Sequence, residues 1–338
     1  MDTHDTSGQL EEALERLHAS GPERLGRLSN HAPMVVEALA ANGQAGAVHR
    51  WLDRYESRLE DFPGRVAPVT DDNWPAALGD VRRAADWTEY FTRTLAEHPW
   101  KSVLARWWPR LLPGLYGAAT HPVIRVGHAV RALGHGESAP RVTELAHALG
   151  YWAARHRPVS GITALPGAPT AARSLDAVPP IEEAEGGFPA RLAAVHHLPV
   201  WAGDVTDPDT ARERLTELVR AATHRYATHG HGEETMLVHA ATAPNAVLRT
   251  LRSLPRALWA PSLHAAWTAT AAVTAMYAPK EPVAYTPPAR LTAEEVLQRA
   301  LAHGDEHVIK FTDTALDVGD EPALAAAQRA VEISQPLV

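Results

Sequence analysis

Apolar residues recur at intervals of three to four along most of the chain, and runs with the strict alternation of a β-strand are scarce. This spacing places apolar side chains on one face of a helix. We therefore predict an all-α fold, a single large helical domain spanning residues 1–338. The predicted helices are Leu10–Leu17, one that begins near Asn30, Ala45–Leu59, Trp74–Glu97, Lys101–Leu112, His121–Leu133, Arg141–Arg155, Asp209–His229, Glu233–Ala241, Ala243–Leu254, Ser262–Tyr277, Thr292–His303 and Glu306–Leu316.

Long proline- and glycine-rich connections interrupt this pattern. Residues 158–189 read PVSGITALPGAPTAARSLDAVPPIEEAEGGFP, a composition typical of a surface connection or a lid rather than of a packed helix. If the chain has an internal domain boundary, we expect it within residues 158–189. A second connection of this kind covers residues 278–290.

Composition narrows the classes of function. The formal net charge is -8, and acidic and basic residues are interspersed, which argues against a nucleic-acid partner or an anionic membrane surface. The chain has no cysteine, so any metal must be bound by nitrogen and oxygen ligands. The sequence has neither a secretory signal nor an apolar run long enough to cross a bilayer, and we predict a cytoplasmic protein.

Histidines are the residues most suited to a metal site. His121 and His128 lie seven residues apart in HPVIRVGHAVRAL, so two helical turns bring both rings to one face of the predicted helix. Histidines among apolar residues are costly to bury unless each is hydrogen-bonded or bound to a metal. The segment therefore predicts either two metal ligands or two hydrogen-bonded histidines of the core or the surface.

A second histidine pair shares its predicted helix with a lysine. His303, His307 and Lys310 follow one another at i, i+4 and i+7 in HGDEHVIKFTDTAL, with Lys310 between two apolar residues. Burial lowers the pKa of a lysine, and a neutral amine can react with carbon dioxide to give an anionic carbamate. The alternative is an ordinary lysine that extends its charge to the surface.

Two single histidines complete the candidates. His31 lies in SNHAPM near a predicted helix start, and His239 lies on the apolar helix of VHAATAPNAV. A single histidine on an apolar face is usually structural. Several inward imidazoles with few carboxylates nearby would instead suit a redox metal such as iron, although zinc and copper accept the same ligands.

Four segments together, in this order, resemble the questin oxidase-like family. They are SNHAPM with WLDRYESRLEDFP, HPVIRVGHAVRAL, VHAATAPNAV and GDEHVIKF, and they span almost the whole chain. The resemblance implies an all-helical non-haem iron (Fe²⁺) oxygenase that uses O₂ to oxidise or cleave the rings of an anthraquinone-type aromatic polyketide, in the manner of a Baeyer-Villiger insertion or a dioxygenation.

The resemblance also implies an iron site held by four histidines and a carboxylated lysine. Carried onto this chain, the lysine is Lys310, and five histidines compete for the four places: His31, His121, His128, His239 and His307. His303 lies outside the motif and ranks below them. Some relatives are associated with reduced nicotinamide, but no nucleotide-binding motif is present, so NADPH is not assigned.

Three further residues are candidates for contact with an aromatic substrate. Arg125 could attract a phenolate or carboxylate, and Trp51 and Trp267 could form part of an aromatic wall, although such tryptophans are more often core residues. Two other functions stay open. One is a zinc-dependent hydrolase, and the other is a non-catalytic helical protein that binds an aromatic ligand; metal content would separate both from an iron oxygenase.

Overall fold

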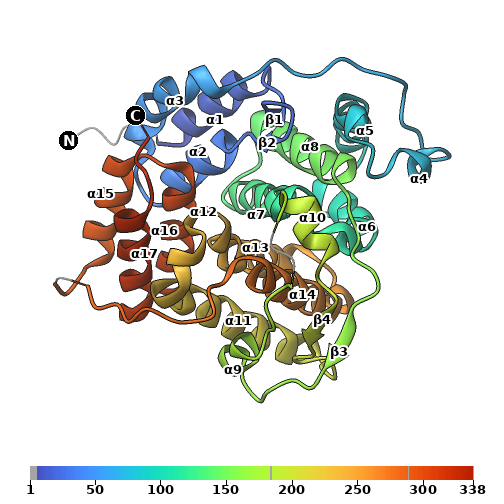
Figure 1. The fold of residues 1–338 in the computed structure, drawn as a ribbon. Helices are drawn as coiled ribbons and strands as arrows, with labels where there is room; N and C mark the ends of the chain where they lie inside the picture. The colour runs from blue at the N-terminus through green and yellow to red at the C-terminus, as the bar shows by residue number, and fades with distance from the viewer. Residues whose placement is uncertain (1–5, 183–184, 288, 338) are drawn as a thin grey trace. The chain divides into compact units, whose positions relative to one another are not determined.

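The computed structural model describes residues 6–182, 185–287 and 289–337 (Figure 1), and it confirms the prediction of an all-α fold. The chain divides into two compact units. Unit 1 comprises residues 1–158 with 252–254, and unit 2 comprises residues 159–251 with 255–338. The division falls at the start of the predicted 158–189 connection. The single domain remains a prediction.

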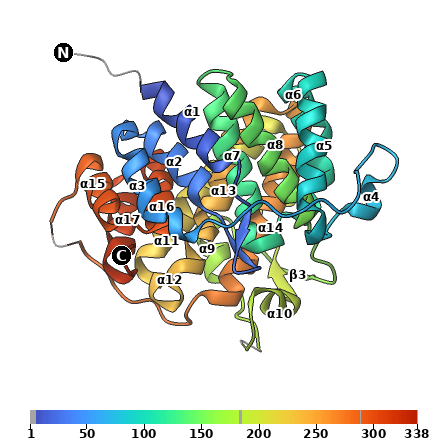
Figure 2. The same cartoon turned by 90° about the horizontal axis from the view of Figure 1, so that it is seen from above.

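Unit 1 is helical apart from one short hairpin. Helices α5, α7 and α8 lie side by side, and α1 and α2 pack together (Figures 1 and 2). The hairpin pairs Glu23 with Ser29 in antiparallel register. The elements are α1 (Thr6–Leu17), β1 (Glu23–Arg24), β2 (Leu28–Ser29), α2 (Ala32–Ala41), α3 (Val48–Tyr55), α4 (Trp74–Ala77), α5 (Ala84–Glu97), α6 (Trp100–Leu111), α7 (His121–Gly134) and α8 (Ala139–Ala154), with 3-10 turns at Ala45–Ala47, Glu56–Arg58, Val81–Arg83, Leu112–Gly114 and Gly117–Thr120.

Helix α7 is the central element of unit 1. Its residues from His121 to Val130 are all buried, and Pro122 occupies the first turn, where its missing N–H costs nothing. In the same unit, Trp108 of α6 and Trp152 of α8 meet edge to face, with their ring centroids 5.2 Å apart. A helix enclosed on all sides fixes the direction of each of its side chains, including the two candidate histidines.

Unit 2 is built around α11, α13 and α14, and α15, α16 and α17 pack against one another (Figure 1). Two short strands pair in parallel, with Ala164 opposite Leu198. The elements are β3 (Thr163–Leu165), α9 (Ala171–Asp176), α10 (Phe188–Ala193), β4 (His197–Pro199), α11 (Pro208–His229), α12 (Glu234–Leu237), α13 (His239–Thr250), α14 (Trp259–Tyr277), α15 (Ala293–His303), α16 (Glu306–Val318) and α17 (Glu321–Ile333), with 3-10 turns at Gly230–Gly232 and Arg256–Leu258. The 3-10 turn Leu251–Ser253 begins in unit 2 and ends in unit 1.

The structure corrects several predicted elements. The predicted helix Trp74–Glu97 is broken after Ala77, because Leu78 is extended and Gly79 takes a φ of +81°, which a helix does not allow. Residues 158–189 are less irregular than expected, since they contain β3, α9 and the beginning of α10; residues 183–184 lie outside the described part. Helix α17 was not predicted.

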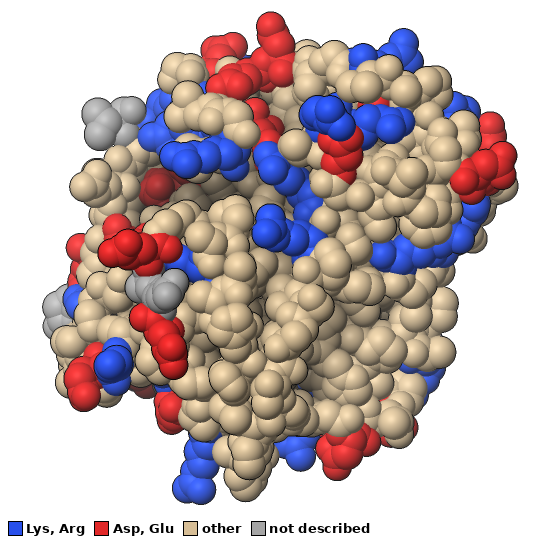
Figure 3. All heavy atoms as spheres, turned by 45° about the vertical axis from the view of Figure 1, so that its right-hand side comes forward, with Lys and Arg blue, Asp and Glu red and all other residues tan. Residues whose placement is uncertain are grey.

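The surface agrees with the mixed charge of the sequence. Figure 3 shows basic and acidic side chains near one another at many places on one face of the molecule. Among the described residues, no helix combines the length and the apolar character that crossing a membrane requires. The cytoplasmic location and the absence of a nucleic-acid partner remain predictions.

Candidate metal centre

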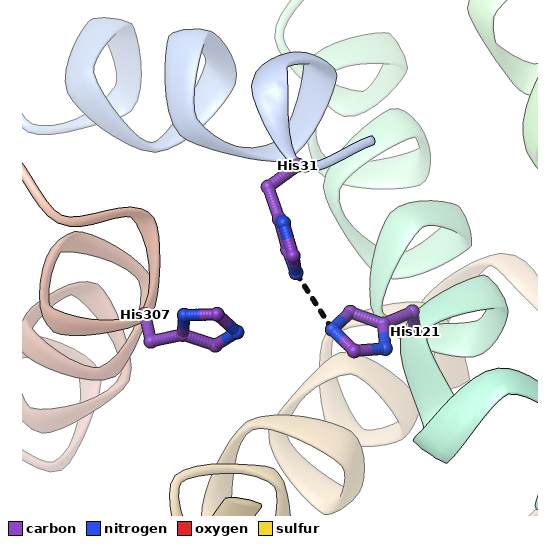
Figure 4. Close-up of side chains that lie close together, drawn as sticks. All are labelled: His31, His121 and His307. Atoms are coloured by element: carbon purple, nitrogen blue, oxygen red, sulfur yellow. Dashed lines mark hydrogen bonds between the residues drawn. The ribbon is translucent and has the colours of Figure 1, made fainter. Parts of the chain in front are cut away.

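Unit 1 brings two of the predicted histidines into direct contact. His31 precedes the first residue of α2, and His121 is the first residue of α7. Their Nε2 atoms lie 2.7 Å apart, and their rings meet at an interplanar angle of 67°. Figure 4 draws this pair and the hydrogen bond between the rings, together with the side chain of His307. Two buried imidazoles thus direct the same nitrogen toward one point.

Hydrogen bonds hold both rings in this arrangement. The Nδ1–H of His121 donates to the carbonyl oxygen of Ala118 at 2.6 Å, which leaves a lone pair on Nε2. The backbone N–H of His31 donates to the Tyr55 hydroxyl at 3.3 Å. An imidazole whose Nδ1–H donates to a carbonyl, so that the Nε2 lone pair can bind, is the usual arrangement of a metal-ligating histidine.

His128 makes a different set of contacts. Its Nδ1 donates to the Glu37 carboxylate at 2.6 Å, and Arg131 pairs with the same carboxylate. Burial alone would raise the pKa of Glu37, but Arg131 and His128 outweigh it and hold that pKa at about 2. These contacts place His128 in an ion pair with Glu37. Its predicted convergence with His121 on one metal ion remains a prediction. Within the described residues, His128 belongs to no group of three or more closely spaced histidine or carboxylate ligand atoms.

Unit 2 brings together His239, His307 and Lys310. The rings of His239 and His307 lie 5.7 Å apart between centroids, and His239 is completely buried. The Nδ1–H of His239 donates to the Met236 carbonyl oxygen at 3.0 Å, which again leaves a lone pair on Nε2. Burial lowers the pKa of His239 well below its usual value, and the neighbouring Lys310 and His307 lower it further. His239 is therefore a neutral imidazole.

Lys310 is enclosed rather than extended to the surface. Its side chain is 1% exposed, and within the described residues its Nζ has no hydrogen-bond partner. Burial lowers the pKa of Lys310 to about 8, although Glu306 and Asp305 offset part of that effect. The alternative of an ordinary surface lysine is wrong. An amine with this pKa has an appreciable neutral fraction near neutral pH, as carbamate formation requires.

Two acidic residues, Asp305 and Glu306, directly precede His307, and the sequence did not single them out as ligands. Asp305, Glu306 and His307 offer ligand atoms that all lie within 4.8 Å of one another. The Asp305 carboxylate already caps α16, since it accepts the backbone N–H groups of His307 and Val308. It also lies 3.7 Å from Nδ1 of His307. Asp305 therefore fixes the first turn of α16, which carries His307. His303 is occupied elsewhere, with its Nε2 bonded to the Ser334 carbonyl.

The three predicted substrate residues have structural partners. Arg125 is buried and forms two hydrogen bonds to Glu144, at 2.5 and 2.8 Å. Trp51 stacks on Tyr55 with the centroids 4.8 Å apart. The Trp267 indole N–H donates to the Pro199 carbonyl at 2.8 Å. A role in substrate binding remains a prediction for all three.

An open pocket of about 600 Å³ lies in unit 2, between β3, β4 and the proline-rich connection. Its walls include Ile181, Val195 and Ala275, with His196 and His197 also lining it. None of the predicted ligands or substrate residues lines this pocket. It therefore adds nothing to the candidate metal centre.

A buried histidine pair predicts how the stability of unit 1 depends on pH. His18 and His147 lie 5.0 Å apart between ring centroids, with Glu144 and Arg125 beside them. Burial lowers the pKa of both rings and Arg125 lowers each further, although Glu144 offsets part of the effect on His18. Below pH 6.5 these two histidines therefore bind protons more readily in the unfolded chain than in the folded chain. We expect stability to fall from pH 6.5 downward, by at most roughly 1.4 kcal/mol per pH unit for each such histidine, until that ring also binds a proton in the folded chain.

The check is urea unfolding at pH 8 and pH 5.5 of the parent protein and of His147→Gln, which cannot take up a proton. The variant should show a smaller loss of unfolding free energy between the two pH values. His135→Gln, at an exposed position, is the control and should keep the full loss. An identical loss in His147→Gln would contradict this account of unit 1.

One comparison with known proteins bears on identity. The model of the family described as Questin oxidase-like matches residues 28–139. This range contains SNHAPM, WLDRYESRLEDFP and HPVIRVGHAVRAL, with His31, His121 and His128, whereas His239, His307 and Lys310 lie beyond it. No curated protein matches the chain. This match supports the predicted family over residues 28–139 and, with it, an oxidase, while metal, mechanism and substrate lie beyond it.

Proposed function

We propose that this chain, a questin oxidase-like protein by its match over residues 28–139, is a non-haem iron oxygenase of aromatic polyketides. In this proposal O₂ is the oxidant, and the reaction is a Baeyer-Villiger-like insertion or a C–C cleavage of an anthraquinone-type ring. The observation that carries it is the His31–His121 pair, in which two buried Nε2 atoms approach to 2.7 Å. A shared proton or a shared metal ion are the two arrangements that such a contact permits.

The proposed ligands are His31, His121, His239 and His307, with Lys310 as the fifth. In the proposal, His31 and His121 of unit 1 and His307 of unit 2 share one metal ion, because all three offer imidazole nitrogens. His239 and Lys310 join it in the proposal because both are buried and because the Met236 carbonyl keeps the His239 proton away from Nε2. His128 is left out, because Glu37 and Arg131 hold it in a separate ion-pair network.

The donor set fits iron better than a hydrolytic metal. Neutral imidazoles with one anionic oxygen suit Fe²⁺, although zinc and copper accept similar ligands. A hydrolase would also need a carboxylate as general base, and Asp305 beside His307 already uses its Oδ1 to accept two backbone N–H groups at the start of α16. When bound, iron would supply the one-electron chemistry that lets O₂ react with an aromatic ring.

The protein's own residues prepare this chemistry. The Ala118 carbonyl keeps the His121 proton on Nδ1, and the Met236 carbonyl does the same for His239, so both Nε2 atoms present lone pairs. The neutral Lys310 amine attacks the carbon of CO₂ and releases one proton, which gives a carbamate with an anionic oxygen. Burial favours this step because it keeps part of the lysine uncharged.

Residues next to the proposed ligands also bear on where an aromatic substrate could bind. Trp51 stacks on Tyr55, and Tyr55 accepts the His31 amide, so Trp51 acts through Tyr55 on the position of His31. An aromatic substrate that stacks near these rings would gain apolar contact. Arg125 is neutralised by Glu144, which weakens the case for its steering an anion. NADPH is not part of the proposal.

The test is O₂ uptake by iron-loaded protein with hydroxylated anthraquinones, followed by mass spectrometry of the product formed under ¹⁸O₂. We expect substrate-dependent uptake and one labelled oxygen for a monooxygenase or two for a dioxygenase. His121→Gln should abolish uptake, and His303→Gln should not. Binding of the anthraquinone without O₂ uptake would favour the aromatic-binding protein, and stoichiometric zinc would favour the hydrolase.

A further inference from the structure

Thr120, the residue before His121, adopts a costly backbone conformation. Its φ is +67°, and it follows two alanines, Ala118 and Ala119, that are also left-handed. A β-branched residue rarely takes this conformation, and three successive non-glycine residues in it are rarer still. Strain of this kind persists only where the surrounding structure imposes it, and it gathers at functional sites.

The Thr120 hydroxyl does not cap the helix that follows it. Threonine is a preferred residue at the start of a helix, where its hydroxyl accepts a backbone N–H, but Thr120 forms no such bond at the start of α7. The residue is 1% exposed, and within the described residues its Oγ1 has no hydrogen-bond partner. A buried hydroxyl without a partner is unfavourable, which suggests that its partner is a bound molecule.

The position of the hydroxyl favours an anionic oxygen. It lies at the N-terminal end of α7, a helix of 14 residues whose first turn carries no acidic side chain. The partial positive charge of such an end stabilises an anion. A threonine hydroxyl can donate a hydrogen bond to the same oxygen. The next residue is His121, so a molecule bound here lies beside a proposed metal ligand.

We propose that the Thr120 hydroxyl and the N-terminal end of α7 bind an ionised phenol oxygen of the aromatic substrate. This inference rests on the proposed function and names the chemical form in which the substrate binds. A phenolate is the electron-rich form of the ring, and thus the form that reacts most readily with an oxidant. Thr120 then selects hydroxylated anthraquinones over those without a hydroxyl group.

The test uses 2-hydroxyanthraquinone, because its phenolate absorbs at longer wavelength than the neutral phenol. The ligand is titrated into the metal-free full-length protein across a range of pH, so that coordination to a metal cannot ionise the phenol. The bound ligand should ionise about one pH unit below the free ligand. Thr120→Val, which keeps the β-branched shape, should bind about tenfold more weakly and lose that shift, whereas Thr120→Ser should retain both.

Two controls isolate the hydroxyl. Unsubstituted anthraquinone should bind equally to the parent and to Thr120→Val. Thr94→Val removes a buried hydroxyl that donates to the Tyr90 carbonyl, and it should not affect ligand binding. The thermal midpoint of Thr120→Val should be unchanged or higher, because the buried hydroxyl it removes has no partner to lose.

The outcomes separate the two claims. Equal binding of 2-hydroxyanthraquinone by the parent and Thr120→Val would overturn the role of Thr120 and leave the proposed function intact. Equal binding with a lower thermal midpoint would assign the hydroxyl to an ordered water, and it would overturn the role of Thr120 in the same way. No binding of either quinone by the parent would remove the proposed substrate class and this inference with it.

Discussion

Lys310→Met should yield a folded protein that is more stable without metal and binds metal at least a hundredfold more weakly. Burial lowers the Lys310 pKa from 10.5 to about 8, so keeping this ammonium buried at pH 7 costs on the order of 3 kcal/mol. The sign follows from linkage: the cost is absent above pH 10.5, builds up as the pH falls to about 8 and is constant below. Methionine has similar length and no charge, so it removes this cost.

The loss of metal follows from the proposed carbamate, which methionine cannot form. Thermal unfolding of metal-free protein and a competitive chelator titration measure the two effects. Lys280→Met, at an exposed lysine, should change neither. In Lys310→Ala, which leaves a cavity, added propionate should restore part of the metal affinity by standing in for the carbamate. Unchanged affinity in Lys310→Met would remove the lysine from the ligand set.

Gly117→Ala should be among the most destabilising single-methyl additions in unit 1. A Cβ at residue 117 would lie 1.6 Å from the carbonyl oxygen of Arg155 and 2.7 Å from its carbonyl carbon. These are backbone atoms at the end of α8, so the clash cannot be relieved by rotating a side chain. We expect a loss of about 3 kcal/mol or more in the free energy of unfolding.

The same substitution should weaken the metal centre, because Gly117 opens the turn whose Ala118 carbonyl holds His121. Urea unfolding and metal titration report the two effects on one sample. Gly46→Ala is the matched control, since a Cβ there has no atom within 4 Å. It should leave stability unchanged or raise it slightly. If Gly117→Ala behaves like Gly46→Ala, the close approach to Arg155 is wrong.

The sequence predicted the helices that carry the candidate site residues. The seven-residue spacing of His121 and His128 placed them on one helix, and the apolar neighbours of Lys310 made its burial a definite alternative. These features are local, so periodicity and composition are sufficient to detect them. The helical class followed from the same regularity.

Long-range pairings and unusual backbone could not be predicted in this way. Glu37 pairs with His128 across 91 positions, and nothing local distinguishes this carboxylate from one on a solvated helix face. The left-handed turn before His121 consists of two alanines and a threonine, residues whose preferences point to other conformations. Tertiary packing imposes both features. The proposed role of Thr120 depends on the left-handed turn.

The most direct test of the central claim is the metal content of protein purified without added metal and without a histidine tag, measured by mass spectrometry. The account predicts close to one equivalent of iron in the parent protein and its loss in Lys310→Ala prepared in parallel. Zinc in place of iron, or no metal in either sample, would contradict the iron oxygenase.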